Sequence, residues 1–530
     1  MIFEPDGTDS RDHVTAALGQ ATAHHAAGRF AEAIRIHRQI LMQGPAEGDA
    51  LHLLGLATWR TGKPEQAVAW MLRSVAVSPM EATKHYNLGN LLSQLLRNQE
   101  AVACYRTAIG LVPDWYPVRL MLGQRLYDVG TLDEANACFQ EALSRQPDNV
   151  EALCGLSLVR LGLGMVDAAV AGYRAAVCLR PDDGQLLSRL AVGCQQAGNL
   201  HAAIAWIGRA LRITPDSAWY HWRNGCFHVQ RGDYRAGWRG LEWRWRLPGA
   251  GAHQLPVPRW SGEDLAGRTI LLYGEQGLGD TLQFIRYAPL VSARGGRVVV
   301  AVAPPLLRLV GTVAGVDMVR SLYERLPGVD FECPLMSLPM VFGTTTDQVP
   351  AAIPYLAADA ERVAMWRHRL GRGGFKVGVC WQADQVQAYG RERSVPLTAL
   401  RPLASIPGVR LIALQKDWDR AAAAAEGLPF EDLGRDFDGP GEAFADTAAV
   451  MMSLDLIVSC DTVTAHLAGA LGRPVWAIHR FAPDWRWASD RTDTPWYPTM
   501  RLFRQPAPEN WAGAVAAVMG ALRAEVLSAR

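Results

Sequence analysis

The first half of the chain repeats its apolar and small residues with a period of 34. Prolines occupy positions 45, 79, 113, 147, 181 and 215. Glycines occupy 28, 62, 130, 164, 198 and 232, with Leu96 in the skipped position, and alanines occupy 33, 67, 101, 135, 169 and 203. Glycine ends a first helix, alanine lets two helices approach closely, and proline cannot continue a second helix. The pattern predicts stacked helix pairs that share a continuous core.

Six full repeats are predicted over 14–217, and a partial seventh over 218–247 keeps Gly232. The last repeat is unusually aromatic for a solvent-facing end. Aromatic side chains bury a large apolar area at low entropic cost, so this segment is expected to dock the helices on the next domain. A tryptophan-rich core within the last repeat is the alternative. The tryptophans concerned are Trp219, Trp222, Trp238, Trp243 and Trp245.

From Arg268 the pattern changes to apolar runs that alternate with helical stretches. Such alternation is typical of parallel sheets with helices on both faces. Strands are expected at 270–273, 297–302, 316–320 and 329–332, and in a second series at 376–381, 409–415, 454–460 and 474–478. Helices are expected at 304–313, 361–370, 397–405, 443–453, 461–471 and 509–527.

These elements predict an α + α/β protein, in which a helical solenoid precedes two Rossmann-like lobes. The expected boundaries are 14–247 for the solenoid, 248–267 for a Pro/Gly-rich linker, 268–372 for the first lobe and 373–530 for the second. A chain of 530 residues has room for about three domains. Ligands of such sheets bind at the carboxyl ends of the strands.

The charge and the cysteines of the chain bear on its partners and its location. Lys and Arg number 53 against 52 Asp and Glu, which gives no reason to expect a nucleic-acid partner. Nine scattered cysteines without a C-x-x-C pair indicate reduced thiols in the cytoplasm. The start lacks the pattern of a signal peptide, and the best candidate for a membrane span, 298–319, is interrupted by two prolines, an arginine and an aspartate. We therefore expect a cytoplasmic protein without a membrane span.

The stretch TILLYGEQGLGDTLQFIRYAPL, 269–290, predicts a strand, a glycine-rich turn and a helix. Asp280 lies where the turn becomes the helix, so it is expected to cap the helix and to face the ligand edge of the sheet. Capping alone is the structural alternative to a catalytic role. Gln276 and Gln283 are candidate acceptor contacts on the same stretch.

Polar residues also follow the strands of the second lobe. Arg393 lies on a polar loop after the first strand, and Gln415 and Lys416 leave the end of the next one. Arginine suits bidentate phosphate contacts and lysine acts as a point charge. For these residues, an ordinary solvated loop or strand end is the alternative.

LDLIVSCDTVTAHLAGALGRPVW, 454–476, predicts a buried strand followed by a helix that begins near Asp461. Free N–H groups and the dipole at a helix N-terminus favour an anion, and Thr462 and Thr464 can add hydroxyl donors. Asp461 would repel phosphate, so sugar hydroxyls or capping suit it better. His466 lies one turn after Thr462 and has either a structural or a functional role.

Residues 480–505 form a Pro- and Trp-rich stretch that is too long for a simple connection. Trp485 is expected to contact the sugar or the acceptor together with three other aromatic side chains, at 487, 496 and 497. Arg486 is expected to meet phosphate or the acceptor. The alternative is an aromatic plug that closes the interface of the lobes.

The 34-residue period with its Gly, Ala and Pro positions resembles the tetratricopeptide repeat. EQGLGD…QFIRY at 275–287 and CDTVTAHLAGALGRPVW at 460–476 resemble the bacterial heptosyltransferase-like glycosyltransferases of the GT-B fold. The combination is similar to protein O-linked N-acetylglucosamine transferases and to bacterial repeat-containing glycosyltransferases that modify flagellin.

This resemblance implies a metal-independent glycosyltransferase, with Asp280 as the catalytic base. It implies a nucleotide-sugar donor site that includes Gln415, Lys416, Asp461, Thr462, Thr464, His466 and Arg393. Gln415 and Lys416 fit only loosely, because their spacing is shorter here. The nucleotide sugar is a substrate, so no cofactor is expected.

Three functions remain open at this stage. The first is transfer of a sugar to a hydroxyl of a protein acceptor that the repeats recruit, flagellin being one acceptor that the resemblance suggests. The second is a binding adaptor whose GT-B half is inactive. The third is a glycosyltransferase with a lipid or polysaccharide acceptor, against which the repeat half argues.

Overall fold

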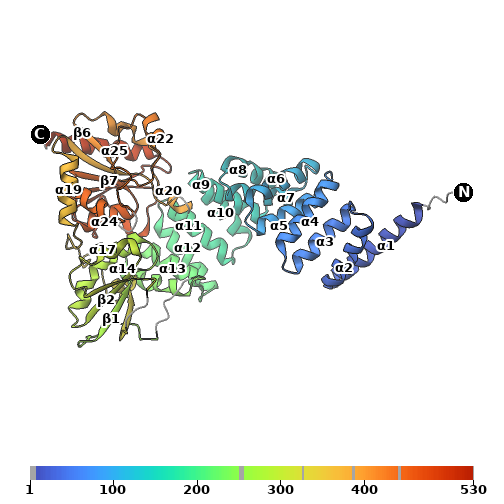
Figure 1. The fold of residues 1–530 in the computed structure, drawn as a ribbon, viewed down its shortest axis with the longest axis horizontal. Coiled ribbons are helices and arrows are strands. Elements are labelled where there is room, and N and C mark those ends of the chain that lie inside the picture. The colour runs from blue at the N-terminus through green and yellow to red at the C-terminus, as the bar shows by residue number, and fades with distance from the viewer. Residues whose placement is uncertain (1–6, 250–255, 325–327, 385–387, 440–442, 529–530) are drawn as a thin grey trace. The chain divides into compact units, whose positions relative to one another are not determined.

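The computed structural model describes residues 7–249, 256–324, 328–384, 388–439 and 443–528 (Figure 1). The chain divides into two compact units, 1–181 and 182–530. Part of the expected linker, 250–255, lies outside the described residues.

The first unit consists of helices packed in consecutive antiparallel pairs. Each pair contributes two helices of 13 or 14 residues, except that the first helix has 20. They are α1 (Gly7–Ala26), α2 (Phe30–Gln43), α3 (Gly48–Arg60), α4 (Pro64–Val77), α5 (Ala82–Gln94), α6 (Asn98–Leu111), α7 (Tyr116–Asp128), α8 (Leu132–Arg145), α9 (Val150–Gly162) and α10 (Val166–Leu179).

The small residues of the repeat act as expected. Gly62 turns the chain between α3 and α4 with a φ of +78°. Leu96, in the position where glycine is skipped, adopts the same left-handed conformation with a φ of 60°. A Cβ on Gly55 would lie 2.6 Å from Cγ of Met71, and Ala67 is fully buried. The helices of a pair therefore pack too closely for larger side chains at these positions.

The second unit begins with two more helix pairs, formed by α11 (Gly184–Gln196), α12 (Leu200–Ile213), α13 (Ala218–Gln230) and α14 (Tyr234–Leu241). A 3-10 helix, η1 (Glu242–Arg246), follows. The rest of the unit contains two sheets, which are parallel throughout.

The four-stranded sheet has the order β3-β2-β1-β4. Its strands are β1 (Thr269–Tyr273), β2 (Arg297–Val302), β3 (Met318–Ser321) and β4 (Phe331–Pro334). Short helices connect them: α15 (Leu278–Phe284), η2 (Ile285–Tyr287), α16 (Ala288–Ser292), η3 (Pro304–Leu306), α17 (Leu307–Val310), η4 (Leu335–Ser337) and α18 (Leu338–Val341).

The five-stranded sheet has the order β6-β5-β7-β8-β9. Its strands are β5 (Phe375–Cys380), β6 (Val409–Ala413), β7 (Leu456–Cys460), β8 (Val475–His479) and β9 (Met500–Arg504). The helices around it are α19 (Ala360–Leu370), α20 (Ala388–Arg393), α21 (Leu397–Leu400), η5 (Arg401–Ser405), α22 (Arg420–Ala425), α23 (Ala445–Met451), α24 (Val463–Ala470), η6 (Trp485–Trp487) and α25 (Trp511–Ser528).

The α + α/β architecture predicted from the sequence is confirmed. Every expected strand is present, and each begins within two residues of its predicted first residue. Four local expectations are wrong. Residues 388–393 form α20 rather than a polar loop, and β9 runs through the expected loop at 480–505. The expected helix at 304–313 is shortened to η3 and α17, and the one at 397–405 is split into α21 and η5.

The last helix corrects a further expectation. Within the described residues, Trp511–Ser528 is long and apolar enough to cross a membrane by length and composition, whereas 298–319 contains β2. Core helices pass the same test, and α25 buries Ala514, Val515 and Val518 in the cluster that covers one face of the five-stranded sheet. One stripe of α25 thus packs on the sheet, while only 33% of the helix is buried.

Helices α13 and α14 dock on the α/β part of their own unit. Trp238 is 3% exposed, donates from Nε1 to the carbonyl of Thr344 at 2.9 Å, and lies edge-on to Trp485 and Trp496. Gln230 donates from Nε2 to the carbonyl of Pro483 at 3.1 Å. The docking predicted for the aromatic segment is thus borne out at Trp238, which joins the same apolar cluster as both sheets.

Not every tryptophan of that segment docks. Trp219 is half exposed, and Trp243 stacks on His221 of the helical part. Trp245, in contrast, contacts Tyr273 at the end of β1.

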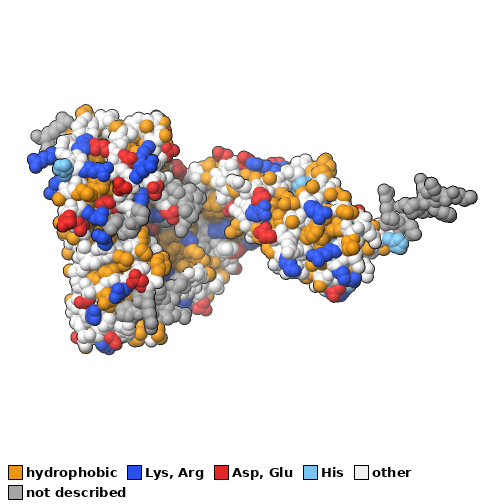
Figure 2. Space-filling view, in the orientation of Figure 1, with side chains coloured by type: hydrophobic (Ala, Val, Ile, Leu, Met, Phe, Trp, Pro, Cys, Tyr) orange, Lys and Arg blue, Asp and Glu red, His pale blue; other side chains and the backbone are white. Residues whose placement is uncertain are grey.

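Figure 2 shows acidic, basic and hydrophobic side chains mixed over the visible face of the molecule. This distribution agrees with the near-neutral net charge of +1.

We expect Trp238→Ala to destabilise the second unit by about 3–5 kcal/mol, because it removes a buried indole and its hydrogen bond. Trp219→Ala serves as the control, and it should cost about 1 kcal/mol or less because the side chain is half exposed. Calorimetric melts of both full-length variants measure the difference. Equal melting temperatures would show that Trp238 does not hold α14 on the sheets.

Candidate active site

In each sheet, the strand order reverses beside one central strand. In the four-stranded sheet, β1 lies between β2 and β4, so the chain first builds on one side of β1 and then returns to the other. In the five-stranded sheet, β5 lies between β6 and β7 in the same way. Crevices at such switch points, outside the carboxyl ends of the strands, are where α/β proteins bind ligands.

The loop after β1 leads from this crevice into α15. Its N-cap is Gly277, and Asp280 is the third residue of the helix rather than the cap that the sequence suggests. The Asp280 Oδ2 atom accepts a hydrogen bond from the N–H of Gly277 at 3.0 Å. The carboxylate therefore closes the first turn from inside the helix, as in a capping box, and is 9% exposed.

In the five-stranded sheet, the end of β7 leads directly to the start of α24. Thr462 is the N-cap of α24, but its side chain makes no capping hydrogen bond. Its hydroxyl and the first N–H groups of the helix are thus not tied to each other, which suits a bound anion. Asp461 and Thr464 flank it, and both side chains are buried.

Helices α15 and α24 pack against each other, which brings the carboxyl ends of β1 and β7 close together. A Cβ on Gly279 would lie 2.8 Å from Cδ2 of His466, so only glycine fits at this contact. His466 shares a hydrogen bond of 2.9 Å between its Nδ1 and the hydroxyl of Tyr497. Burial, with Arg486 and Arg286 nearby, lowers the pKa of His466 well below its ordinary value, so the ring is neutral at physiological pH.

Arg486 joins residues from both sheets. Its guanidinium donates to Oδ1 of Asp280, which is 206 residues away in sequence, and from Nη1 to Oδ1 of Asp484 at 2.5 Å. Burial by itself lowers the pKa of Arg486, but the carboxylates of Asp280, Asp484 and Asp461 outweigh it and raise the pKa. The arginine is therefore a fixed positive charge among three acids.

Asp461 has a looser partner. Nη1 of Arg393 lies 3.8 Å from its Oδ2 atom. Burial and the neighbouring Asp484 carboxylate raise the pKa of Asp461 to about 6, although Arg393 and Arg486 oppose the shift. The structure thus gathers Asp280, Arg486, Asp461 and Arg393 into one charged cluster, which we call the aspartate–arginine cluster.

Gln415 and Lys416 lie at the same edge of the five-stranded sheet, but they bind other groups. Gln415 accepts a hydrogen bond from the N–H of Gln382 at 2.9 Å. Lys416 is exposed and donates from Nζ to the carbonyl of Asp438 at 2.6 Å. Asp438 in turn accepts the N–H of Asp446 at the start of α23, so this segment is held by local hydrogen bonds.

The two glutamines of the glycine-rich stretch differ in burial. Gln276 is exposed and has a φ of 58°. Gln283 is fully buried, and within the described residues neither atom of its amide has a hydrogen-bond partner. Only Gln276 is therefore placed to meet an acceptor from solvent.

The aromatic residues of 480–505 are packed inside the protein. Trp485 is 9% exposed, and Trp487, Trp496 and Tyr497 are at most 1% exposed. Their expected role as sugar-stacking walls is not supported by this burial, which fits the alternative of an aromatic plug. The Trp485 ring contacts the Arg486 guanidinium at 4.0 Å, so it positions that arginine.

Sequence reasoning missed a second buried arginine that fixes the glycine-rich loop. Arg244 of η1 binds both carboxylate oxygens of Glu275, at 2.8 and 2.6 Å, and donates to Glu242 at 2.6 Å. Glu275 directly precedes Gln276 in the loop. In the WRWR run at 243–246, only the tryptophans suggested a role from the sequence. The partner of Arg244 lies 31 positions later in the chain, so the neighbouring sequence does not predict the pair.

Arg286 connects the segments that flank the site. It is 3% exposed and donates to the carbonyls of Gln283 at 2.7 Å and Pro350 at 3.2 Å, to the carbonyl of Trp496, and to the hydroxyl of Tyr355 at 2.9 Å. The side chain is thereby satisfied on all sides in an apolar environment.

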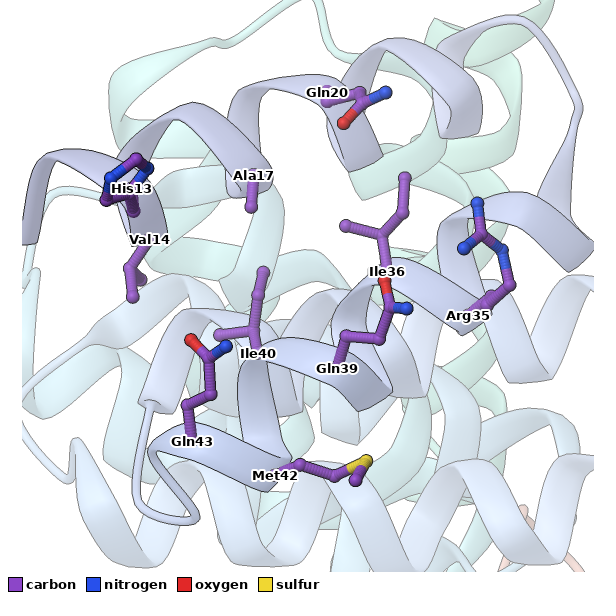
Figure 3. Close-up of a pocket in the computed structure, with 10 residues that line it drawn as sticks. All are labelled: His13, Val14, Ala17, Gln20, Arg35, Ile36, Gln39, Ile40, Met42 and Gln43. Atoms are coloured by element: carbon purple, nitrogen blue, oxygen red, sulfur yellow. The ribbon is translucent and has the colours of Figure 1, made fainter. Parts of the chain in front are cut away.

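A separate concavity of about 730 Å³ lies in the first unit. Figure 3 shows that it is lined by side chains of α1 and α2, and none of the predicted site residues is among them. In the part of the chain that the structure describes, no group of three or more His, Cys, Asp and Glu side chains is arranged to hold a metal ion.

Comparison with protein families matches models described as "Tetratricopeptide repeat" to residues 18–82, 85–114 and 120–185. The N-terminal region thus contains tetratricopeptide repeats. Among curated proteins, the chain is 28% identical over 319 residues to "Protein FlbA" of Caulobacter vibrioides (strain ATCC 19089 / CIP 103742 / CB 15). The match covers 54% of this chain and 52% of that protein, so it spans about half the length of the relative.

Solved structures that resemble this chain are also repeat proteins. One is YrrB, "a TPR protein with an unusual peptide-binding site", with a TM-score of 0.32 and 18% identity over 35% of this chain and 95% of that one. Another is a tetratricopeptide repeat protein from Parabacteroides merdae ATCC 43184, with a TM-score of 0.38 and 16% identity over 46% of this chain and 94% of that one.

Beside the site, His479 makes the fold sensitive to acid. Burial, with Arg504 nearby, lowers the pKa of His479 from 6.5 to about 3. Its neutral form is favoured by folding, so this stability is complete above pH 6.5 and is lost as pH falls from 6.5 toward 3. The loss should reach about 2–3 kcal/mol near pH 4.5.

We expect His479→Phe to remove this part of the pH dependence, because the variant has no ring to protonate. Urea unfolding between pH 7 and pH 4.5 measures it, with the exposed His368→Phe as the matched control. An unchanged slope in the His479 variant would exclude His479 as the source.

Proposed function

We propose that this protein is a glycosyltransferase, which transfers a sugar from a nucleotide-sugar donor to a hydroxyl of a protein acceptor. In this proposal the tetratricopeptide repeats recruit the acceptor, and the two sheets form the lobes of a GT-B unit. The four-stranded sheet with 268–372 would serve the acceptor, and 373–530 would hold the donor. The parallel α/β architecture is compatible with an enzyme domain.

The observation on which the proposal depends is the packing of α15 on α24, which brings the carboxyl ends of β1 and β7 close together. A carboxylate, Asp280, lies within contact of Arg486, next to the N-terminus of α24. Glycosyl transfer needs a base for the acceptor hydroxyl and positive or dipolar groups for the departing nucleotide diphosphate. Both kinds of group are present in one buried cluster.

The roles follow from the chemistry of each group. Asp280 would accept the proton of the acceptor hydroxyl as the hydroxyl oxygen bonds to the anomeric carbon of the sugar. The bond from that carbon to the nucleotide diphosphate would break, and the leaving oxygen would keep the electron pair. The first turn of α24, Thr462, Arg393 and Arg486 would stabilise its negative charge without a metal ion. His466, which is neutral, would support this turn of α24 and could contact the sugar.

The protein acceptor is inferred from the repeats, since stacked repeats form extended binding surfaces. The resemblance of the sequence motifs to flagellin-modifying enzymes makes flagellin the first acceptor to test. A cytoplasmic location, in which nucleotide sugars are available, completes the proposal. Exposed Gln276 is the acceptor contact that the burial favours.

We expect Asp280→Asn to lower the transfer rate by about 10²–10⁴-fold, the usual contribution of a general base. Asparagine keeps the size of the side chain and an oxygen that can accept from Gly277, so the fold should be retained. The measurement is the rate of sugar transfer by mass spectrometry, together with a thermal melt of the same preparation.

Asp330→Asn is the matched control. Asp330 lies just before β4 and accepts a hydrogen bond from the N–H of Thr269, at the end of β1 that is far from Asp280. Its role is therefore structural. Its variant should transfer sugar at a near-normal rate. If Asp280→Asn also turns over normally, Asp280 only stabilises the first turn of α15, and another group must act as the base.

Removal of residues 1–181 should abolish modification of the protein acceptor while nucleotide binding persists, because the first unit holds most of the repeats and none of the aspartate–arginine cluster. Calorimetry with nucleoside diphosphates measures nucleotide binding, and mass spectrometry of the acceptor measures its modification. Full modification by the shortened chain would argue for an acceptor that does not need the repeats, such as a lipid or polysaccharide. Nucleotide binding without any transfer by the full chain would favour the adaptor.

A further inference from the structure

Both oxygens of the Asp280 carboxylate are already engaged. Oδ2 accepts the N–H of Gly277 at 3.0 Å, and Oδ1 accepts the guanidinium of Arg486. The side chains of Asp280 and Arg486 are 11% and 12% exposed, so water competes little with this contact. The guanidinium takes one of the two lone pairs of Oδ1, so it covers one side of the carboxylate against an acceptor hydroxyl.

The positive charges of the site are engaged in the same way. Arg486 contacts Asp280 and Asp484, and Arg393 lies 3.8 Å from Asp461. Three carboxylates thus face two guanidinium groups beside the N-terminus of α24. A diphosphate that binds there carries more charge than a carboxylate and offers the same planar fork of acceptors to arginine.

We propose that Arg486 is shared between Asp280 and the donor diphosphate, and that donor binding draws it away and uncovers the base. This proposal rests on the function proposed above and adds a device to it: the carboxylate is covered when the donor site is empty. Asp484, which also binds the backbone N–H of Arg486 at 3.2 Å, anchors the arginine during the exchange.

The stacking of Arg486 on Trp485 gives the exchange a defined path. The ring contacts the guanidinium at 4.0 Å and is itself packed against Trp238. The arginine therefore has one face fixed by an aromatic ring, and its donors can turn from one oxygen acceptor to another in the plane of the guanidinium.

Competition for one guanidinium predicts a specific pattern of nucleotide affinities. Asp280→Asn should tighten the binding of a nucleoside diphosphate by about threefold to tenfold, because Arg486 no longer has to leave a carboxylate. Arg486→Gln should weaken binding by about tenfold or more. In the double variant, Asp280→Asn should have no tightening effect, because the shared group is gone.

Asp330→Asn is the matched control. It removes one negative charge next to β1, but Asp330 accepts the N–H of Thr269 at the other end of that strand and does not contact Arg486. Its nucleotide affinity should stay within about twofold of the wild type. The experiment is calorimetry of the full-length chain and these variants with UDP, GDP, ADP and CDP, with thermal melts to confirm folding.

The outcomes are distinguishable. Tightening by Asp280→Asn that disappears in the Arg486→Gln background supports the exchange. Tightening that persists there shows simple repulsion between Asp280 and phosphate, and overturns it. Unchanged affinity in Asp280→Asn also overturns it, while the proposed function stands. If the wild type binds none of the four nucleotides, the donor site and the proposed function fail as well. Arg486→Met, which keeps an apolar side chain of similar length but has no donor, replaces Arg486→Gln if that variant does not fold.

Discussion

Helices α15 and α24 pack so closely at Gly279 that any side chain there would collide with the His466 ring. This contact brings the carboxyl end of β1 next to the carboxyl end of β7, although the two strands belong to different sheets. Asp280 of α15 meets Arg486 of η6 in the same region. The glycine after Leu278 is therefore as much a requirement of the site as its charged residues.

The helical hairpin α13–α14 packs on the two sheets and forms one unit with them. Trp238 enters the apolar cluster that joins both sheets, and Arg244 holds the loop that leads to Asp280. The break between the two compact units thus falls after Pro181 and not at the Pro/Gly-rich stretch near residue 250. Two helix pairs with the repeat pattern are built into the α/β unit, where they stabilise it directly.

The fold was predictable because its signals are local. A 34-residue period fixes the helix pairs, and apolar runs fix most strands. β9 was missed because MRLFR is short and follows a run of prolines, tryptophans and charges. The site was predictable only in part. Asp280, Asp461, Thr462 and His466 stand at strand–helix junctions, where sequence reasoning looks for them. The pairing of Asp280 with Arg486 depends on packing between distant segments, and no local pattern reports it.

Tryptophan content also misled the sequence reasoning for a physical reason. An indole can line a binding wall or fill a core, and its neighbours in sequence are the same in both cases. Burial decides between them: Trp487 and Trp496 lie in the core, and Trp485 contacts Arg486.

Arg286 has a consequence for how far the two sheets can move apart. Its guanidinium binds carbonyls from three separate stretches of chain and lies against the rings of Tyr355, Trp496 and Tyr497. A wide swing of one sheet away from the other would strip these partners from a charge in an apolar interior, at a cost of several kcal/mol. Opening by a large hinge is thereby disfavoured.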